Sequence, residues 1–451
     1  MIVFVCRTSY ARNGRRTNRS RPTFESKIHL LRSGQGKSTC GGRRRPGGAM
    51  ADVREVFDRL PGSATRSANR RKVFLAVAIK ADTQVGIARR THLSQATVSA
   101  AVKELERAGL VRGAKTDGKG RGGKVFLIPT EQVGVGVHLG FNHVTVVARR
   151  LDKVFDDVAV RVNAEGVARG WNRALPVVRD MILDVIEATG RERSDVFSLG
   201  VAVPRMIDPR TNEFTRPVLH PWRPGDDPAK DLGDLLGVRA VIDNDANLGA
   251  LAEQTYGTRE HAETVVYVKV STGVGAGIIV HNSVLRGHRG MAGEIGHLTV
   301  DPDGAMCQCG GRGCLETVIG AEALVQQVRL ARPRAGADFE HLEDVIRAAK
   351  EHDAVCTRVI KDAGRTLGRF LAQLCNLFNP DVVVVGGQLA ECDLLLGGCK
   401  ESLYRFALPG AVDDSSGFAL TLSELGTRAE AQGALVLGLR GQENPASTAK
   451  G

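Results

Sequence analysis

One histidine and three cysteines in a short segment constrain this chain more than any other feature. The sequence places His297 ahead of Cys307-Gln-Cys309-Gly-Gly-Arg-Gly-Cys314. One imidazole and three thiolates supply the four ligands of a closed tetrahedral zinc site, and the glycines let the loop fold around the ion. Because no position is left for an activated water, we expect the zinc to be structural. The alternative is a cluster of small buried cysteines beside an unrelated histidine.

The basic residues gather in the first third of the chain. Residues 1–49 hold twelve Lys and Arg against one acid, Glu25, and residues 66–124 hold fourteen against four acids. The whole chain has a formal net charge of +12, so residues 125–451 are net acidic. A nucleic acid partner is therefore expected at the first third.

The two ends of the chain are expected to be disordered. Residues 1–49 are rich in Arg, Gly and Ser and hold few large apolar residues, so they bury too little surface to offset the entropy of ordering. This stretch is either a basic arm that tethers DNA or translated upstream sequence ahead of a start at Met50, and we favour the second interpretation. Residues 441–451 form the expected C-terminal tail.

Residues 50–130 have the pattern of a winged helix-turn-helix domain. A short helix is expected over Gln84–Arg90, followed by a turn and a second helix over Gln95–Ala108. Ser94 stands in the N-cap position of this second helix, and Gly109 stands where a C-cap glycine belongs. Two apolar stretches, at 110–111 and 125–128, then flank a Gly- and Lys-rich loop and predict a hairpin with a basic tip.

The predicted DNA contacts lie on the exposed face of the second helix and on the hairpin, or wing. They are Gln95, Thr97, Ser99, Lys103, Arg121 and Lys124. Gln95 has the amide that reads a base edge, Lys103 pairs with a backbone phosphate, and Arg121 reaches the minor groove. The alternative is a three-helix packing unit with a solvated basic face, but the local charge and the basic wing favour DNA.

Beyond Pro129, strands and helices alternate in two successive rounds, which predicts two similar α/β lobes with a ligand cleft between them. Strands are expected at 133–139, 144–149, 158–162, 197–203, 264–270, 277–280, 298–300 and 382–385, with helices over 171–189 and between Leu315 and Phe378.

From about Val133 to Leu439 the chain resembles the ROK family of bacterial repressors and sugar kinases. The resemblance rests on Glu294-Ile-Gly-His297 with the cysteine cluster, Asn244-Asp245-Ala246-Asn247, Ser271-Thr272-Gly273-Val274-Gly275 and a strand that ends in Gly386-Gly387. It implies a two-lobed α/β actin-like ATPase (sugar kinase) fold behind the winged helix-turn-helix (α+β) domain. We expect a first lobe over 131–243, completed by a C-terminal helix at 428–440, and a second lobe with the zinc site over 244–427.

By this resemblance the sugar site is lined by Asn244, Asp245, Glu294, His297 and Glu316, and His297 serves both zinc and sugar. Carboxylates and an amide in a cleft discriminate between sugars, because a wrong hydroxyl leaves a buried partner unpaired. Two alternatives remain open. Asn244 and Asp245 also suit the N-cap of a helix over Leu248–Tyr256, and Glu294 and His297 form a surface pair if their segment is helical.

Three departures from the family pattern bear on activity. His138 replaces the acid of the first phosphate loop, and Phe141 stands where a glycine lets backbone approach phosphate. Arg205 replaces a small residue near the sugar. We therefore expect no kinase activity and predict a transcription regulator. The alternative is an ATP-dependent, glucokinase-like sugar kinase in which Asp245 is the general base.

The expected partners are a double-stranded DNA operator and a sugar or sugar-phosphate effector, with the chain acting as a homodimer or a dimer of dimers. Nine cysteines without an evident pairing and no export signal predict a cytoplasmic protein. The sequence has no apolar run of about eighteen residues, so no membrane segment is expected.

Overall fold

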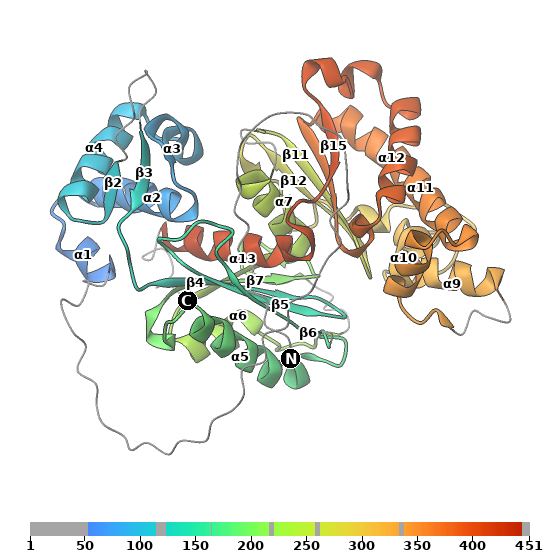
Figure 1. Ribbon diagram of the computed structural model, residues 1–451, viewed down its shortest axis with the longest axis horizontal. Helices are drawn as coiled ribbons and strands as arrows, with labels where there is room; N and C mark the ends of the chain where they lie inside the picture. Colours follow the sequence, from blue (N-terminus) through green and yellow to red (C-terminus); the bar gives the residue numbers. More distant parts are fainter. Residues whose placement is uncertain are drawn as a thin grey trace, which may run out of the picture.

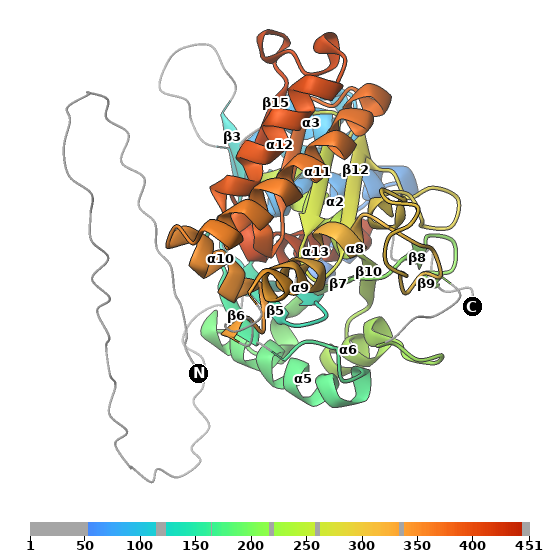
Figure 2. The same ribbon diagram turned by 90° about the vertical axis from the view of Figure 1, so that its right-hand side faces the viewer.

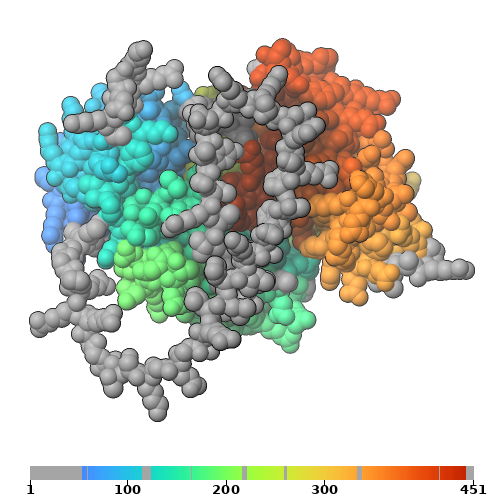
Figure 3. Space-filling view, in the orientation of Figure 1, coloured from blue at the N-terminus to red at the C-terminus, as the bar shows by residue number. Residues whose placement is uncertain are grey.

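The computed structural model describes residues 53–113, 123–163, 165–215, 221–257, 262–332 and 338–443. Within them a small N-terminal domain sits at one end of a two-lobed body, and the helical outer side of the second lobe lies at the other end (Figure 1, Figure 3). Our predictions for residues 1–49, for Arg121 and for the last eight residues of the tail fall outside the described residues.

The N-terminal domain has the predicted helix-turn-helix and hairpin. Its described helices are α1 (Val53–Arg59), α2 (Ala64–Ile79), α3 (Gln84–Thr91) and α4 (Gln95–Arg107). Its sheet has the order β1 (Asp82–Thr83), β3 (Lys124–Leu127), β2 (Val111–Gly113). Ser94 caps α4 by accepting a hydrogen bond from the N–H of Thr97 at 3.1 Å, and Gly109 ends it with φ +71°. These are the start and stop signals on which the prediction of this helix rested.

The first lobe is built on a mixed sheet of five described strands. Their order is β10 (Ala240–Asn244), β7 (Val196–Val203), β4 (Val133–Leu139), β5 (Val144–Arg150), β6 (Ala159–Asn163). Helices α5 (Trp171–Ala188) and α6 (Pro228–Leu236) lie below this sheet in Figure 1, and α13 (Ala429–Arg440) lies above it. Strands β10, β7 and β4 are parallel, so their carboxyl ends meet at one edge, where such folds bind ligands.

The second lobe repeats this plan with helices on its outer face. Its sheet has the order β13 (Ser283–Val284), β12 (Val274–Val280), β11 (Val265–Val270), β14 (Val382–Gly386), β15 (Ala419–Leu422). The helices that face the viewer in Figure 2 are α8 (Glu316–Ile319), α9 (Ala321–Ala331), α10 (Leu342–Lys350), α11 (Ala354–Phe378) and α12 (Asp393–Phe406). They share one apolar core with the sheet.

Two helices, α7 (Asp245–Tyr256) and α13, pack against each other between the two sheets (Figure 1). The sheet and α13 approach so closely that a methyl group at Gly200 would lie 1.8 Å from the carbonyl oxygen of Ala434. A methyl group at Gly433 of α13 would likewise lie 1.8 Å from the carbonyl oxygen of Leu248 in α7. Glycine is therefore required at both positions, and the two lobes are joined through backbone packed on backbone.

Three local predictions differ from the structure. Helix α7 begins at Asp245, one turn before the expected Leu248, because Asn244 acts as its N-cap. Residues 298–300 are not a strand: a 3₁₀ turn over Ile295–His297 precedes a single bridge between Thr299 and Cys314. Residues 441–443 extend α13 as a 3₁₀ turn instead of starting the tail.

A small hairpin, β8 (Ile207–Asp208) and β9 (Glu213–Phe214), extends from the first lobe. Among the helices that the structure describes, none is long and apolar enough to cross a membrane.

We expect Gly200→Ala to lower the free energy of unfolding by about 1–3 kcal/mol, because the added methyl group must push α13 away from β7. The matched control is Gly397→Ala in α12, where a methyl group meets nothing within 4 Å. There alanine should stabilise the helix by up to about 1 kcal/mol. Urea unfolding measures both changes, and equal stability of the two variants would contradict the close packing of α13.

Candidate functional site

A cavity of about 550 Å³ lies between the two lobes at the carboxyl ends of β4, β7 and β10. All five residues predicted for the sugar site, Asn244, Asp245, Glu294, His297 and Glu316, line it. Three elements bring them together: the start of α7, the turn before Leu298, and the start of α8. Arg205, the departure noted in the sequence, lines the same cavity.

Asp245 is held by a buried network at the centre of the molecule. Its carboxylate accepts a hydrogen bond from Nζ of Lys269 at 2.6 Å, and Nε2 of His138 lies 3.5 Å from the same oxygen. Nζ of Lys269 is also 3.2 Å from Nε2 of His138 and 3.8 Å from Glu430 on α13. All four side chains are buried. The network thus joins β4, α7, β11 and α13.

The charges of this network fix its protonation. Burial alone would raise the pKa of Asp245, but the positive charge of Lys269 and hydrogen bonds from His138 and Lys269 hold it below its ordinary value. Burial alone would lower the pKa of Lys269, yet the carboxylates of Asp245 and Glu430 keep it above its ordinary value. Asp245 is therefore a carboxylate paired with an ammonium group.

Sequence reasoning did not identify Lys269 as a site residue. The available signal was a lysine inside an otherwise apolar strand, Val265-Val-Tyr-Val-Lys-Val270. A charged residue inside a strand that is buried on both faces needs a partner of opposite charge. Its partner, Asp245, is 24 residues earlier in the chain, so only the fold shows which one it is.

The remaining residues of the cavity differ in how freely they face a ligand. Both oxygen and nitrogen of the Asn244 side chain are used: Oδ1 caps α7, and Nδ2 donates to the carbonyl of Arg205 at 3.3 Å. Glu316 accepts from the N–H of Val274 at 3.1 Å and from Gln308 at 3.3 Å. Burial, with the nearby carboxylates of Asp245 and Glu316, raises the pKa of Glu294 to about 7. The capping alternative thus holds for Asn244, whereas Asp245 faces the cavity.

Residues 138–143, the first phosphate loop of the kinase pattern, are hydrogen-bonded to two other parts of the chain. The carbonyl oxygens of Gly140 and Phe141 accept hydrogen bonds from the N–H groups of Val167 and Ala168, both at 3.0 Å. Asn142 reaches across to the second lobe, where its amide donates to Oγ1 of Thr272 at 3.1 Å. Thr272 belongs to the Ser271–Gly275 motif, at the turn between β11 and β12, so the first phosphate loop touches this glycine motif of the second lobe.

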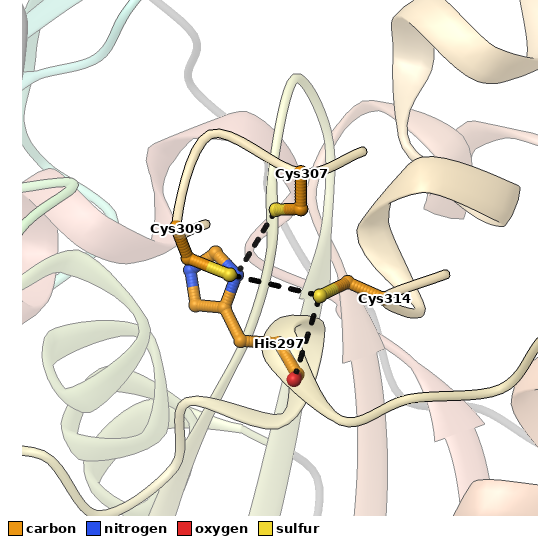
Figure 4. A group of neighbouring side chains, drawn as sticks. All are labelled: His297, Cys307, Cys309 and Cys314. Carbon is orange, nitrogen blue, oxygen red and sulfur yellow. Dashed lines mark hydrogen bonds between the residues drawn. The ribbon is translucent and has the colours of Figure 1, made fainter. Parts of the chain in front are cut away.

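His297, Cys307, Cys309 and Cys314 form one compact group (Figure 4). One donor atom from each lies within 4.8 Å of the others, with Nδ1 of His297 3.5 Å from Sγ of Cys307 and the sulfurs of Cys309 and Cys314 3.7 Å apart. Thiolates bound to zinc at about 2.3 Å in a tetrahedron stand about 3.8 Å apart. The donor set and its spacing therefore fit a tetrahedral metal ion.

The loop that carries these cysteines depends on its glycines. Gly313 has φ +60°, and a methyl group on it would lie 1.5 Å from the carbonyl oxygen of Asp301. Without an ion, burial and the hydrogen bonds and negative charge that Cys309 and Cys307 present to the Cys314 thiol raise its pKa to about 12. Metal binding must therefore displace protons. Nε2 of His297 faces Glu294 at 3.9 Å, so the same ring stands between the metal group and the cavity.

The predicted DNA contacts on α4 lie at the surface. Gln95 and Lys103 are exposed, Thr97 and Ser99 are half-buried, and Lys124 is exposed at the start of β3. Oγ1 of Thr97 is hydrogen-bonded to Oγ of Ser94 at 2.8 Å. The opposite face of α4 is committed to the core through Val98, Ala101, Val102 and Leu105. The helix thus offers a polar face to solvent, as a recognition helix must.

The architecture is that of a winged helix-turn-helix protein with a two-lobed, sugar-kinase-like domain. The family model described as ROK family matches residues 135–440, which is more than half of the chain, and a MarR family model matches residues 73–122. The chain belongs to the ROK family.

Proteins of both kinds, repressor and kinase, are similar to this chain. A xylose repressor of Caldicellulosiruptor bescii is 28% identical over 67% of this chain and 78% of its own. A glucokinase of Halalkalibacterium halodurans is 34% identical over 49% of this chain and 71% of its own. The crystal structure of a ROK family transcriptional regulator, a homologue of the E. coli MLC protein, is 21% identical with a TM-score of 0.66, over 85% of this chain and 98% of its own. That structure supports the fold.

Changing one cysteine of the metal group should remove its ion. We expect Cys309→Ser to lower the metal affinity by at least about a hundredfold, since loss of even a supporting contact behind a ligand costs 10- to 100-fold. The control is Cys392→Ser, which removes a cysteine outside the group. Elemental analysis of both purified proteins measures metal per chain, and equal metal content would contradict the assignment of these ligands.

Proposed function

We propose that this protein is a transcription regulator, and more specifically a repressor whose binding to a DNA operator is controlled by a sugar or sugar derivative in the cavity between the lobes. The observation that carries the proposal is the exposed polar face of α4 in a chain whose cleft also gathers the carboxylates of Asp245, Glu294 and Glu316. One chain thus holds both a DNA-reading helix and a site of hydroxyl acceptors. The similarity to a xylose repressor supports this.

The sugar is proposed to bind through its hydroxyls to Asp245, Glu294, Glu316 and the Nε2 side of His297, with Asn244 shaping the rim. Sugars need fixed acceptors, and ionised Asp245 offers one. Arg205 adds a half-buried cation whose pKa is lowered by burial, against the attraction of three carboxylates. This cation favours sugars that carry a phosphate or carboxylate group. A panel of neutral and phosphorylated sugars distinguishes these effectors from neutral ones.

The metal of the cysteine group is proposed to be a structural zinc. Three thiols and one imidazole are the soft donors that zinc prefers, and the fourth position is filled by protein. The ion would fix the loop that carries Glu316 and the ring that faces Glu294, and it would take no part in chemistry.

A sugar kinase is the second candidate, favoured by the presence of Asp245 and by the similarity to a glucokinase. A general base must be free to accept a proton, but Lys269 lies 2.6 Å from Asp245 and stabilises its ionised form. His138 occupies the position of the phosphate-loop acid, and the carbonyls of Gly140 and Phe141 are turned to Val167 and Ala168. Phosphoryl transfer depends on positioning and on neutralised charge, and these residues supply neither.

DNA readers of this kind bind two-fold operators, so the chain is proposed to act as a homodimer or dimer of dimers. Half-sites would then lie about 10 bp, or a multiple of it, apart. An operator is obtained by selecting duplexes from a random library with the full-length protein. Failure to enrich any duplex sequence would refute the proposed function.

Lys103→Ala should weaken binding to the selected operator and reduce the slope of log affinity against log salt by about one, because one phosphate contact is lost. Gln95→Ala should instead relax the preference at one base pair, at a cost of about 1–3 kcal/mol. The matched control is Lys361→Ala on α11, an exposed lysine in the second lobe. Fluorescence anisotropy across a salt series measures all three, and an equal effect of Lys103→Ala and Lys361→Ala would contradict the assignment of α4.

The wild-type protein should bind a sugar without phosphorylating it. A thermal-shift panel of xylose, glucose, N-acetylglucosamine and their 6-phosphates or 5-phosphates should give a rise for at least one member, because a ligand of the folded state raises the midpoint. ADP release with the same sugars and magnesium-ATP should stay at the level of Asp245→Asn. Release that depends on the sugar and disappears in Asp245→Asn would establish the kinase instead.

A further inference from the structure

Helix α7 runs from the sugar cavity to the N-terminal domain. Its first residue, Asp245, lines the cavity, and its last two residues, Thr255 and Tyr256, contact the end of α2 in the N-terminal domain. Its twelve residues span about 18 Å at about 1.5 Å per residue. One continuous element therefore touches both proposed functional sites.

The contacts at the far end of α7 complete the end of α2. The hydroxyl of Tyr256 donates to the carbonyl of Ile79 at 3.2 Å, and Lys80 donates to the carbonyl of Thr255 at 3.1 Å. From β5, the buried guanidinium of Arg149 donates to the carbonyl of Ala78 at 2.7 Å. The last carbonyls of a helix have no partner within it, so Tyr256 and Arg149 cap α2, and Lys80 joins its end to the last turn of α7. Tyr256 is itself fixed by the Phe155 ring, stacked on it at 4.7 Å.

The end of α2 in turn fixes the DNA-binding helices. Arg90 of α3 donates to the carbonyls of Ala76 and Lys80 at 3.0 and 2.7 Å. At the other side, Arg70 of α2 is paired with Glu104 of α4 at 3.0 Å. A shift of the last turn of α2 therefore acts directly on α3, and it reaches α4 through Arg70 when α2 moves as a whole.

Helix α7 has little freedom to absorb a change along its length. Eleven of its twelve residues are buried. A methyl group at Gly433 of α13 or at Gly277 of β12 would lie 1.8 Å and 2.1 Å from its backbone oxygens. A helix enclosed this closely on two sides responds by moving as a body, because packed interiors shift between discrete arrangements and do not deform continuously.

At the near end, the position of α7 depends on the pair of Asp245 and Lys269. This pair, with His138 beside it, ties the start of α7 to one strand of each lobe, β4 and β11. Lys269 and His138 both approach Oδ2 of Asp245, so a sugar hydroxyl that donates to this carboxylate draws charge from the oxygen that holds them. Sugar binding in the cavity thus acts on Asp245, the residue that anchors the start of α7.

We propose that α7 transmits occupation of the sugar cavity to the DNA-binding domain, and that Tyr256 is the positioning residue through which the shift reaches α2. This inference rests on the proposed function, because it assigns the route by which the effector acts on the operator. It requires that a change at Asp245 alter the structure or stability of residues 76–80. It also requires the hydroxyl of Tyr256 for this effect.

The test perturbs one end of α7 and measures the other by hydrogen–deuterium exchange of the full-length protein. Asp245→Asn should change exchange at the amides of residues 77–80 by at least about fivefold, the lower range of allosteric coupling. In the background of Tyr256→Phe, which keeps the stacked ring and removes the hydroxyl, the same change should fall below about twofold. Tyr404→Phe on α12 is the matched control, since it removes a hydroxyl that is bound to Asp414. It should leave the fivefold response intact.

Two further perturbations keep the test decisive if the Asp245→Asn protein does not fold. His138→Gln alters the same network from β4, and saturation with xylose, glucose or N-acetylglucosamine alters it without mutation. Unchanged exchange at 77–80 in a folded Asp245→Asn or His138→Gln protein overturns the inference. An undiminished response in Tyr256→Phe overturns the role of that residue.

Operator binding separates this inference from the proposed function. If the wild-type protein binds the selected operator and a sugar weakens or strengthens that binding, Tyr256→Phe should bind the sugar normally and lose most of its effect on DNA. If wild type binds neither operator nor sugar, the proposed function fails, whereas the exchange experiment still decides whether α7 couples its two ends. Full sugar response in Tyr256→Phe, with the proposed function upheld, contradicts the inference alone.

Discussion

The ion pair of Lys269 and Asp245 is the interaction on which the arrangement of the two lobes depends. It is buried, it lies at the start of α7, and it recruits His138 from β4 and Glu430 from α13. Breaking such a pair by removing one partner costs far more than the pair contributes, because a charge is left in the interior without compensation. The protein therefore keeps both charges or neither, and the elements that carry them stay together.

The sequence allowed the local structure of the N-terminal domain and the metal group to be predicted, because their signals are local. Ser94 and Gly109 mark the ends of α4, and four metal-type donors lie close together in the chain. Lys269 and Tyr256 were missed for the opposite reason. Their partners, Asp245 and Ile79, are 24 and 177 residues away, and no periodicity or spacing records a contact of that kind.

The strand expected at residues 298–300 shows how a local signal can be overruled. Leu298 and Val300 alternate with Thr299 as strand residues do, but Thr299 forms only one bridge, to Cys314. The loop from His297 to Cys314 must bring four donor atoms together, and this requirement prevails over strand propensity. The same loop then places Glu316 at the start of α8, with its carboxylate on the N–H of Val274.

Recognition and catalysis make opposite demands on Asp245. A general base needs a pKa near the working pH and space for the proton it accepts, whereas a recognition carboxylate must stay ionised and fixed. Lys269 and His138 meet the second demand, because they lower the pKa of Asp245 and both lie against its Oδ2. The fixed charge of Asp245 thus suits the proposed recognition of a ligand more than the transfer of a proton.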